Sequence, residues 1–393
     1  MGAVITGIAR TPLGKFGGAL APLRAVTLGS EAIKGALQRS KLDPARIDEV
    51  IFGQVLQAGE GQITARQAAV GAGVPMTVPS TTVNKVCLSG MTAIAMADRS
   101  VRLGEASFVI AGGMESMSNA PYLTPSARWG ARMGDAQLID VMMHDGLWCA
   151  FDHCAMGESS DSKNAALGIS REQQDAWAAE SHRRAVQAVE AGAFDNEIVP
   201  VLVPQRKGDP VAVKLDEGIR PDTTVESLSR LRPAFSPEGT TTAANASQIS
   251  DGAAAVIVAD RAAAEAAGLP ILAEIVAYGQ VGGPDATLQE RPAEALSLAL
   301  KKAGMAPGDL DLVEINEAFA SVALWSAHML DLDHDKVNVN GGAVALGHPI
   351  GATGARLIVT LVNEMKRRGG GIGAATLCGG GGQGDALIIK VGD

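Results

Sequence analysis

The sequence predicts an α/β protein made of two pseudo-symmetric halves, and an internal repeat is the main reason. An amphipathic helical segment at residues 32–37 reappears at residues 295–300, and a turn containing Pro44 reappears around Pro307. A short apolar segment that reads as a buried strand follows each turn at the same separation along the chain. Two α/β halves of this kind place a ligand site at their junction.

The first copy begins with an apolar strand at Val4–Ala9 and continues after the repeated segment. A strand-like run ends at Val86, and a helix is expected from about Ser89 to Leu103. The apolar run Phe108–Ala111 then predicts a buried strand that ends in the turn Gly112–Gly113.

The second copy follows the same order. The loop around His348 leads into a helix expected from about Thr353 to Arg368, and a strand at residues 373–377 ends in Cys378 and a run of glycines. This comparison places Cys87 and His348 in related loops, and Gly112 and Gly379 in related turns.

A different region separates the halves and reads as an insertion. It holds three of the four tryptophans, many charges and one long helix expected at Arg171–Gly192. The predicted organisation is therefore a first half, an inserted loop domain and a second half, with these bounds: 1–118 plus 250–268, 119–249 and 269–393. The first half resumes at Asp251–Val258, a cap-like turn that leads into a buried strand.

Composition excludes several classes of protein. The chain has 393 residues, an apolar fraction of 47% and a net charge of −10. An acidic chain without a basic run argues against a nucleic-acid partner, and no apolar stretch is long enough to span a membrane. Four cysteines in a chain of this length fit a reduced compartment, so we expect a cytoplasmic protein.

Cys87 is a candidate nucleophile. It precedes a helix that is apolar nearly all round, with Met91 and Ile94 among its residues. The positive end of a helix dipole lowers the pKa of a thiol and favours the thiolate. The local sequence alone is equally compatible with a buried structural cysteine.

Three further residues stand in settings that favour chemistry. His348 lies between Gly347 and Pro349, in a rigid turn before a helix, and Asn316 leaves a buried strand at the edge where α/β proteins bind ligands. Cys378 precedes four glycines that lead into a strand rather than a helix, which argues against a phosphate-binding loop. We expect a tight hairpin that aims Cys378, although Asn316 would also suit a simple turn.

A metal site is the weaker interpretation of the remaining cysteines. Cys149 and Cys154 flank His153, but two cysteines and one histidine are an incomplete zinc ligand set. We expect a structural role for them and no metal.

Taken together, the blocks around Cys87, Asn316, His348 and Cys378 resemble the thiolase family in order and spacing. The resemblance covers the whole chain and is strongest to bacterial short-chain members. It implies a layered αβαβα fold, coenzyme A (CoA) thioesters as substrates, no permanently bound cofactor, and a homodimer or homotetramer. The segment Pro121–Gly146 resembles the tetramer-forming loop of biosynthetic members.

The resemblance also implies a mechanism. Cys87, activated by His348, would take the acetyl group of acetyl-CoA, and Cys378 would remove an α-proton from a second acetyl-CoA to give acetoacetyl-CoA and CoA, or the reverse thiolysis. His348, with a water held by Asn316, would stabilise one oxyanion, and the backbone N–H groups of Cys87 and Gly380 would stabilise the other.

Positions matched to the CoA contacts of the family lie mostly in the inserted region and just after it. They are Arg220, Ser227, Leu231, Phe235, Ala243, Ser247, Ala318 and Phe319. Arg220 would face the phosphate or adenine end, and the apolar residues would face the pantetheine.

The chain departs from the family pattern at four places. Ala155 stands where many short-chain members have histidine, Leu88 replaces a small residue, and Gln248 replaces glycine. The segment Gly282–Leu288 replaces a Met-Gly-rich run. We expect Ala155 to enlarge the acyl end of the pocket and Leu88 to crowd it near the thiol.

Three alternatives compete with a short-chain thiolase. A degradative 3-ketoacyl-CoA thiolase of broader chain length would share all four blocks. A decarboxylating condensing enzyme of related fold would lack the second cysteine, so Cys378 argues against it. A non-catalytic acyl-CoA-binding homologue would be signalled by loss of Cys87 or Cys378, and both are present.

Overall fold

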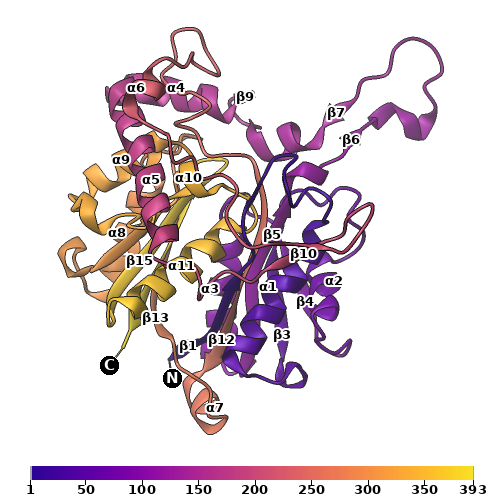
Figure 1. Cartoon of the computed structure of the whole chain (residues 1–393), viewed down its shortest axis with the longest axis vertical. Helices are drawn as coiled ribbons and strands as arrows, with labels where there is room; N and C mark the ends of the chain where they lie inside the picture. Colours follow the sequence, from indigo (N-terminus) through magenta and orange to yellow (C-terminus); the bar gives the residue numbers. More distant parts are fainter. Residues whose placement is uncertain (1, 393) are drawn as a thin grey trace.

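The computed structural model describes residues 2–392, and its frame is one continuous mixed sheet (Figure 1). In spatial order the strands are β14 (Leu312–Ile315), β15 (Gly371–Gly379), β16 (Gln383–Val391), β13 (Ala273–Gly282), β1 (Ala3–Arg10), β12 (Ser250–Asp260), β5 (Phe108–Ser116), β3 (Glu49–Gly53) and β4 (Ser80–Val83), with β2 (Gly14–Lys15) paired to β12. The two half-sheets join where β1 pairs with β13.

The repeat predicted from the sequence is confirmed by the strand pairing. In the first half β3 runs parallel to β5, and β12 runs antiparallel to both β5 and β1. In the second half β14 runs parallel to β15, and β16 runs antiparallel to both β15 and β13. The matching helices are α1 (Ala25–Ser40) and α8 (Arg291–Ala303), and each is followed by a Pro-initiated 3₁₀ turn.

The sheet and helices form five layers. Alternate residues of β12 face opposite sides, so Ala253 and Val256 contribute to different apolar clusters. Outer helices α1 and α2 (Thr64–Gly71) cover the first half, and α8 and α9 (Ala320–Met329) cover the second. The central layer consists of α3 (Ser89–Arg102) and α11 (Thr353–Arg367), which pack against both half-sheets (Figure 1).

The two central helices approach closely at their first turns. A Cβ added at Gly90 would lie 2.8 Å from the backbone of Ala355, and one added at Gly354 would lie 2.4 Å from the backbone of Met91. Glycine is therefore required at both positions. This contact brings the loops before α3 and α11, which carry Cys87 and His348, to the same end of the central layer.

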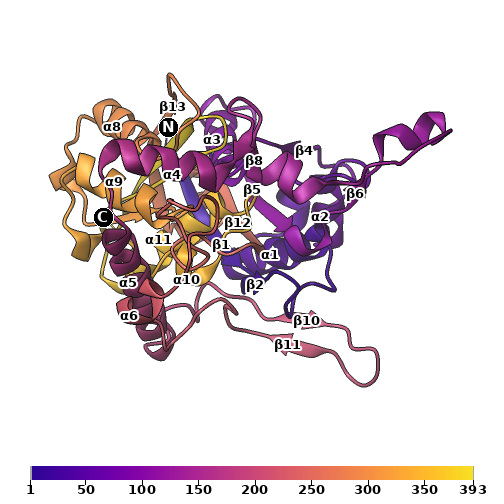
Figure 2. The same ribbon diagram turned by 90° about the horizontal axis from the view of Figure 1, so that it is seen from above.

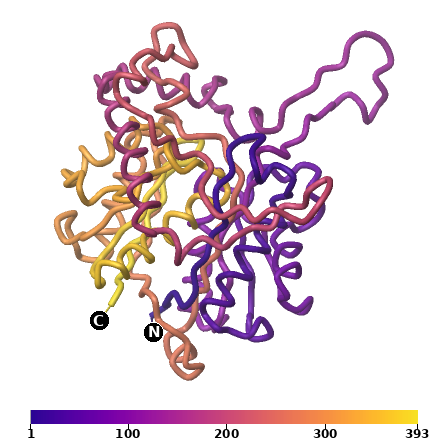
Figure 3. The backbone as a smooth tube through the Cα atoms, in the orientation of Figure 1, coloured from indigo at the N-terminus to yellow at the C-terminus, as the bar shows by residue number. Residues whose placement is uncertain are grey.

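The inserted region covers that end. Its helices are α4 (Met156–Leu167), α5 (Arg171–Glu190) and α6 (Val225–Ser229), and its hairpins are β6–β7 (Tyr122–Leu123, Ile139–Asp140), β8–β9 (Trp148–Cys149, Cys154–Ala155) and β10–β11 (Val201–Val203, Val211–Val213). The long helix begins at a capping box formed by Ser170 and Gln173. The β6–β7 arm projects far from the body (Figure 3), and the β10–β11 hairpin extends along another side (Figure 2). Shorter elements are α7 (Arg261–Ala266) and α10 (Ala343–Leu346).

Two expectations about the first half are wrong. Strand β5 continues through Gly112 and Gly113 to Ser116, so these glycines do not form a turn related to Gly379. A Cβ at Gly112 would lie 2.6 Å from the ring of Phe52, and one at Gly113 would lie 2.0 Å from the oxygen of Gly351. Glycine is needed at these two positions because neighbouring groups leave no space for a side chain on the strand. Asp251 also lies within β12 rather than in a turn before it.

None of the helices within residues 2–392 is long and apolar enough to cross a membrane.

Candidate active site

Cys87 lies in the tight loop between β4 and α3. Val86 has φ 51°, an uncommon conformation for a β-branched residue. Ser89 holds the turn, because its hydroxyl accepts a hydrogen bond from Lys85 N (2.9 Å) and donates one to Val86 O (2.6 Å). The backbone N–H groups of Gly380 and of Cys87 itself face the Cys87 sulfur. The loop therefore directs the thiol at the glycine hairpin of the second half.

The electrostatic expectation for Cys87 is wrong. Burial raises the pKa of the Cys87 thiol to about 12, and the two backbone N–H donors only partly oppose this. The loss of water around the sulfur outweighs the favourable position before a helix. Cys87 is therefore a neutral thiol in the free protein and needs a base.

His348 is arranged as a neutral base. Its Nδ1 lies 2.7 Å from the hydroxyl of Thr353, which donates its own proton to Pro349 O at 2.9 Å. The Thr353 oxygen must then accept from Nδ1–H, which leaves Nε2 with a lone pair. Burial, followed by the charge of Arg356, lowers the pKa of His348 to about 3. Nε2 is buried and has no hydrogen-bond partner within the described chain.

Asn316 presents a second set of unpaired atoms. It follows β14, and both atoms of its side-chain amide are buried without a partner among residues 2–392. Buried polar groups are normally hydrogen-bonded. Asn316 lies two residues before Ala318, which lines the same pocket as His348. The site thus offers unused donors and acceptors to a water or a substrate oxygen.

Cys378 lies near the end of β15, before the hairpin that leads into β16. Gly381 and Gly382 have φ values of 77° and 68°, so the glycine run forms the expected tight turn. Burial raises the pKa of the Cys378 thiol above its usual range, and the next largest cause is the repulsion that a Cys87 thiolate would exert on a Cys378 thiolate. The two sulfurs therefore lie close together, with the backbone of Gly380 beside them.

A cavity of about 450 Å³ opens above His348. It contains six of the eight residues matched to CoA contacts: Arg220, Phe235, Ala243, Ser247, Ala318 and Phe319. The other two lie outside its wall. Ser227 caps the N-terminus of α6 with Thr224, and Leu231 is a surface residue that follows this helix. Cys87, Cys378 and Asn316 are not among the lining residues either. Of the four candidate catalytic side chains, His348 is therefore the one that lines the cavity.

The departures from the family pattern have different outcomes. Ala155 lines the cavity next to Met156. Leu88 does not crowd it, because its side chain is fully buried and packs against Gly379. Gln248 lines the cavity, and its amide donates to Gly218 O, Val344 O and Ala345 O at 2.9–3.2 Å.

Several lining residues escaped the sequence analysis. Lys15 and Phe16 come from β2 and the turn after it, and the remaining apolar wall is formed by Met117, Met143, Leu147 and Ile350. His182 supports the site from α5, since its Nδ1 accepts a hydrogen bond from Arg220 N at 3.1 Å. Among these missed residues, Lys15 alone had a signal in the sequence. It is a cation in a glycine-rich segment, which could have suggested a contact with a phosphate group.

Cys149 and Cys154 face each other across the β8–β9 hairpin. Within residues 2–392 no group of three or more histidine, cysteine or acidic side chains is placed to hold a metal ion.

Comparisons with known proteins agree with this geometry. The family model of the thiolase N-terminal domain matches residues 3–262, and that of the thiolase C-terminal domain matches residues 269–391. The chain belongs to the thiolase family. A probable acetyl-CoA acetyltransferase of Mycolicibacterium smegmatis is 52% identical over 382 residues, which is 97% of this chain and 98% of that thiolase. An acetyl-CoA acetyltransferase of Cupriavidus necator is 51% identical over 98% of both chains.

A solved thiolase has the same fold. The crystal structure of the Bacillus anthracis acetyl-CoA acetyltransferase superposes with a TM-score of 0.96 at 42% identity, and covers 99% of this chain and 98% of that one. The layered thiolase fold expected from the resemblance is therefore confirmed.

Proposed function

We propose that this thiolase is an acetyl-CoA acetyltransferase that condenses two acetyl-CoA molecules to acetoacetyl-CoA and CoA, and catalyses the reverse thiolysis. The observation that carries the proposal is the convergence of Cys87, Cys378 and the N–H of Gly380 beside a cavity that ends at His348. The relatives named above carry this activity in their names.

In the first half-reaction His348 acts as general base. Its free Nε2 takes the proton of the Cys87 thiol while the sulfur attacks the carbonyl carbon of acetyl-CoA. The CoA thiolate leaves and takes that proton from His348. The backbone N–H groups of Cys87 and Gly380 stabilise the oxyanion that forms on the acetyl oxygen.

In the second half-reaction Cys378 acts as general base. His348 Nε2 first takes the proton of the neutral Cys378 thiol. The Cys378 thiolate then removes an α-proton from the second acetyl-CoA, and the carbanion attacks the acetyl carbon on Cys87. The Cys87 thiolate leaves and takes the proton from His348, while Cys378 is again a neutral thiol. The unpaired amide of Asn316 holds a water that, together with the N–H of protonated His348 Nε2, stabilises the enolate oxygen of the second thioester.

The cavity suits the pantetheine arm and phosphates of CoA. Phe235 and Phe319 form its apolar wall, with ring centroids 6.3 Å apart. Arg220 and Lys15 supply positive charge for phosphate groups. Ser227 and Leu231 lie on or just after α6, and we place the nucleotide end of CoA along them.

The test is a thiolysis assay with acetoacetyl-CoA and CoA, combined with mass mapping after incubation with acetyl-CoA. We expect activity and an acetyl group on the Cys87 peptide, with both abolished in Cys87→Ala. Cys378→Ala should still acetylate at Cys87 but form almost no acetoacetyl-CoA, because only the α-proton transfer is lost. An acetyl group found only on another cysteine, or near-normal condensation by Cys378→Ala, would contradict the assignment.

We also propose a homo-oligomer, at least a dimer, with the β6–β7 arm as a contact between copies. The arm exposes a set of large apolar side chains: Tyr122, Leu123, Trp129, Met133 and Leu138. Apolar side chains gathered on a projecting segment are typical of protein interfaces, which supports an assembly of two or more copies.

A further inference from the structure

We propose that two buried carboxylates, Glu115 and Glu317, are positioning residues that hold the His348 loop (residues 343–352) at its two ends. The inference rests on the proposed function, because it concerns how His348 is kept within reach of Cys87. Glu115 comes from β5 of the first half, and Glu317 comes from the segment after β14 of the second half. Neither is among the residues that line the cavity.

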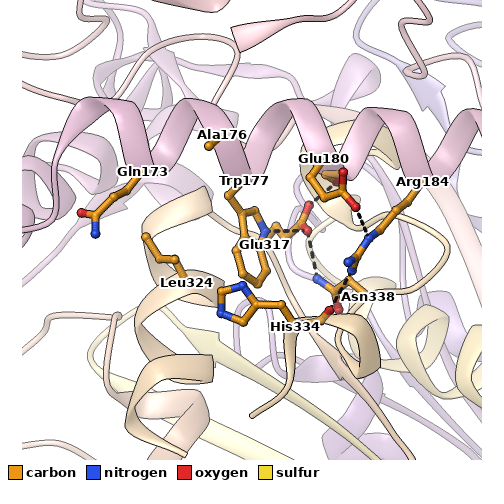
Figure 4. A pocket seen from close by; sticks show the side chains of 10 residues that line it. Gln173, Ala176, Trp177, Glu180, Arg184, Glu317, Leu324, His334 and Asn338 are labelled. Atoms are coloured by element: carbon orange, nitrogen blue, oxygen red, sulfur yellow. Dashed lines mark hydrogen bonds and ion pairs between the residues drawn. The ribbon is translucent and has the colours of Figure 1, made fainter. Parts of the chain in front are cut away.

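Glu317 holds the entrance of the His348 loop. Its Oε2 accepts hydrogen bonds from Val344 N (3.0 Å) and from the hydroxyl of Ser181 (2.7 Å). Its Oε1 accepts from Trp177 Nε1 and Asn338 Nδ2, both at 2.9 Å, and Figure 4 shows both groups pointing at this carboxylate. Because Glu317 directly follows Asn316, the same contacts fix the residue whose unpaired amide faces the site.

Glu115 holds the exit of the loop. Its Oε2 accepts hydrogen bonds from Gly351 N (2.9 Å) and Val55 N (3.0 Å), and its Oε1 accepts from Leu56 N (3.1 Å). Val55 and Leu56 belong to the apolar cluster that surrounds Cys87. One carboxylate therefore joins the His348 loop to the wall of the nucleophile.

The position of Gly351 transmits this restraint to Cys87. The Gly351 oxygen leaves no room for a side chain at three glycines. A Cβ added at Gly53 would lie 2.9 Å from this oxygen, one added at Gly90 would lie 3.1 Å from it, and one added at Gly113 would lie 2.0 Å from it. Gly90 lies in the first turn of α3, three residues after Cys87. The hydrogen bond between Gly351 N and the Glu115 carboxylate thus determines how closely the His348 loop approaches the start of α3.

The chemistry of these contacts requires carboxylates rather than amides. Glu115 faces three donors and Glu317 faces four, and no acceptor within residues 2–392 is hydrogen-bonded to either group. A carboxylate only accepts, whereas an amide would turn an NH₂ group toward one or more N–H groups. Glutamine at either position keeps the side-chain volume but loses the hydrogen bonds made by one of the two oxygens.

The experiment measures single-turnover acetylation of Cys87 by acetyl-CoA in Glu115→Gln and Glu317→Gln, together with kcat, KM and CoA affinity. A misplacement of about 1 Å costs on the order of 100-fold in rate. We expect acetylation and kcat to fall about 10- to 100-fold in each variant, with KM and CoA affinity changed less than about threefold. The double variant should be little slower than the slower single variant, because both groups restrain one loop.

The matched control is Asp48→Asn. The Asp48 carboxylate accepts hydrogen bonds from Ser107 N and Phe108 N at the opposite end of β5 from Glu115. The same exchange of carboxylate for amide there should leave acetylation at the wild-type rate. A general loss of stability would slow all three variants equally and would overturn the proposal.

Two further variants keep the test decisive if a glutamine variant fails to fold. Glu115→Asp retains the charge on a shorter side chain, and Ser181→Ala removes one donor to Glu317 while leaving its contact with Val344. Each should acetylate at a rate between those of wild type and the glutamine variants. Wild-type acetylation rates in the folded variants would overturn the proposal, whereas a wild-type protein that acquires no acetyl group would instead refute the proposed function.

Discussion

At the scale of single residues, Cys87 and His348 form a pair of neutral groups rather than an ion pair. Burial raises the thiol pKa to about 12 and lowers the imidazole pKa to about 3, so both groups are uncharged across the physiological range. The tautomer fixed by Thr353 keeps the Nε2 lone pair free. The proton is therefore transferred only when a substrate carbonyl is present to receive the sulfur.

This arrangement predicts the pH dependence of alkylation in the free enzyme. A thiol reacts with iodoacetamide as its thiolate, and the thiolate fraction rises until the pH reaches the pKa. With the pKa of Cys87 raised to about 12, the alkylation rate should increase about tenfold per pH unit from pH 7 to pH 10. The measurement is the rate of label incorporation in the Cys87 peptide, with Cys87→Ser as control. A rate that levels off below pH 9 would show that the thiol ionises more easily.

At the scale of elements, the segment 243–249 joins the two sides of the site. Ala246 forms an isolated β-bridge with Phe319, and Ser247 N donates a hydrogen bond to Ala318 O at 3.0 Å. Ile249 forms a second β-bridge with His348. The side chain of Gln248 adds the links to Gly218, near Arg220, and to the carbonyls of Val344 and Ala345. One glutamine thus connects the loop that carries Arg220, for which we propose a CoA contact, to the loop that carries His348.

Gln248→Ala should weaken CoA binding more than chemistry. The change leaves three carbonyl oxygens without this donor, and an unsatisfied buried group costs about 1–3 kcal/mol. We expect the free energy of unfolding to fall by about that amount and KM for CoA to rise about 3- to 10-fold, with the acetylation rate of Cys87 changed less.

The matched control for this prediction is Gln205→Ala. Gln205 also donates to a backbone carbonyl, that of Val203, but it lies beside the β10–β11 hairpin away from the cavity. It should leave KM unchanged. An unaltered CoA affinity in Gln248→Ala would contradict a binding role for this link.

The same elements show which features the sequence could reveal. Local periodicity located α3, α5 and α11 to within one or two residues, because their apolar faces and caps lie in contiguous sequence. Gly112 and Gly113 were misread as a turn, because the Phe52 ring and Gly351 oxygen that demand small residues there come from distant segments. The direction of the Leu88 side chain and the pKa of Cys87 also depend on packing between halves, which no local pattern records.

At the scale of the whole molecule, the two copies of the repeat carry different functional residues at equivalent positions. Cys378 is the second-last residue of β15, and Glu115 is the second-last residue of the corresponding strand β5. One half therefore carries the candidate acid/base at a place where the other half carries a buried carboxylate that binds backbone N–H groups. A sequence motif identified Cys378 as a candidate catalytic residue. The role inferred for Glu115 could be recognised only from its contact with Gly351 in three dimensions.

The size of the whole cavity bears on chain length. Under the proposed function, a cavity of about 450 Å³ holds the pantetheine arm as well as the acyl group, which leaves little room for a long chain. Met117, Leu147 and Ile350 line the cavity and belong to the apolar cluster against which Cys87 packs, and Ala155 is one of the small residues in the cavity wall. One methylene in an apolar pocket changes binding by about 1–3 kcal/mol, so a short chain should be strongly preferred.

We therefore expect kcat/KM for thiolysis to be highest with the C4 3-ketoacyl-CoA, lower with C6 and lowest with C10. Ala155→His fills the added space and should depress C6 relative to C4 by a further factor of about 10 or more. Ala212→His, on the exposed strand β11, is the control and should leave the C6 to C4 ratio unchanged. A clear rise toward C10 in the wild-type protein would instead favour a degradative thiolase. In that case the cavity must widen when acyl-CoA binds, and the segment that carries Ala155 between β9 and α4 is where that movement would have to occur.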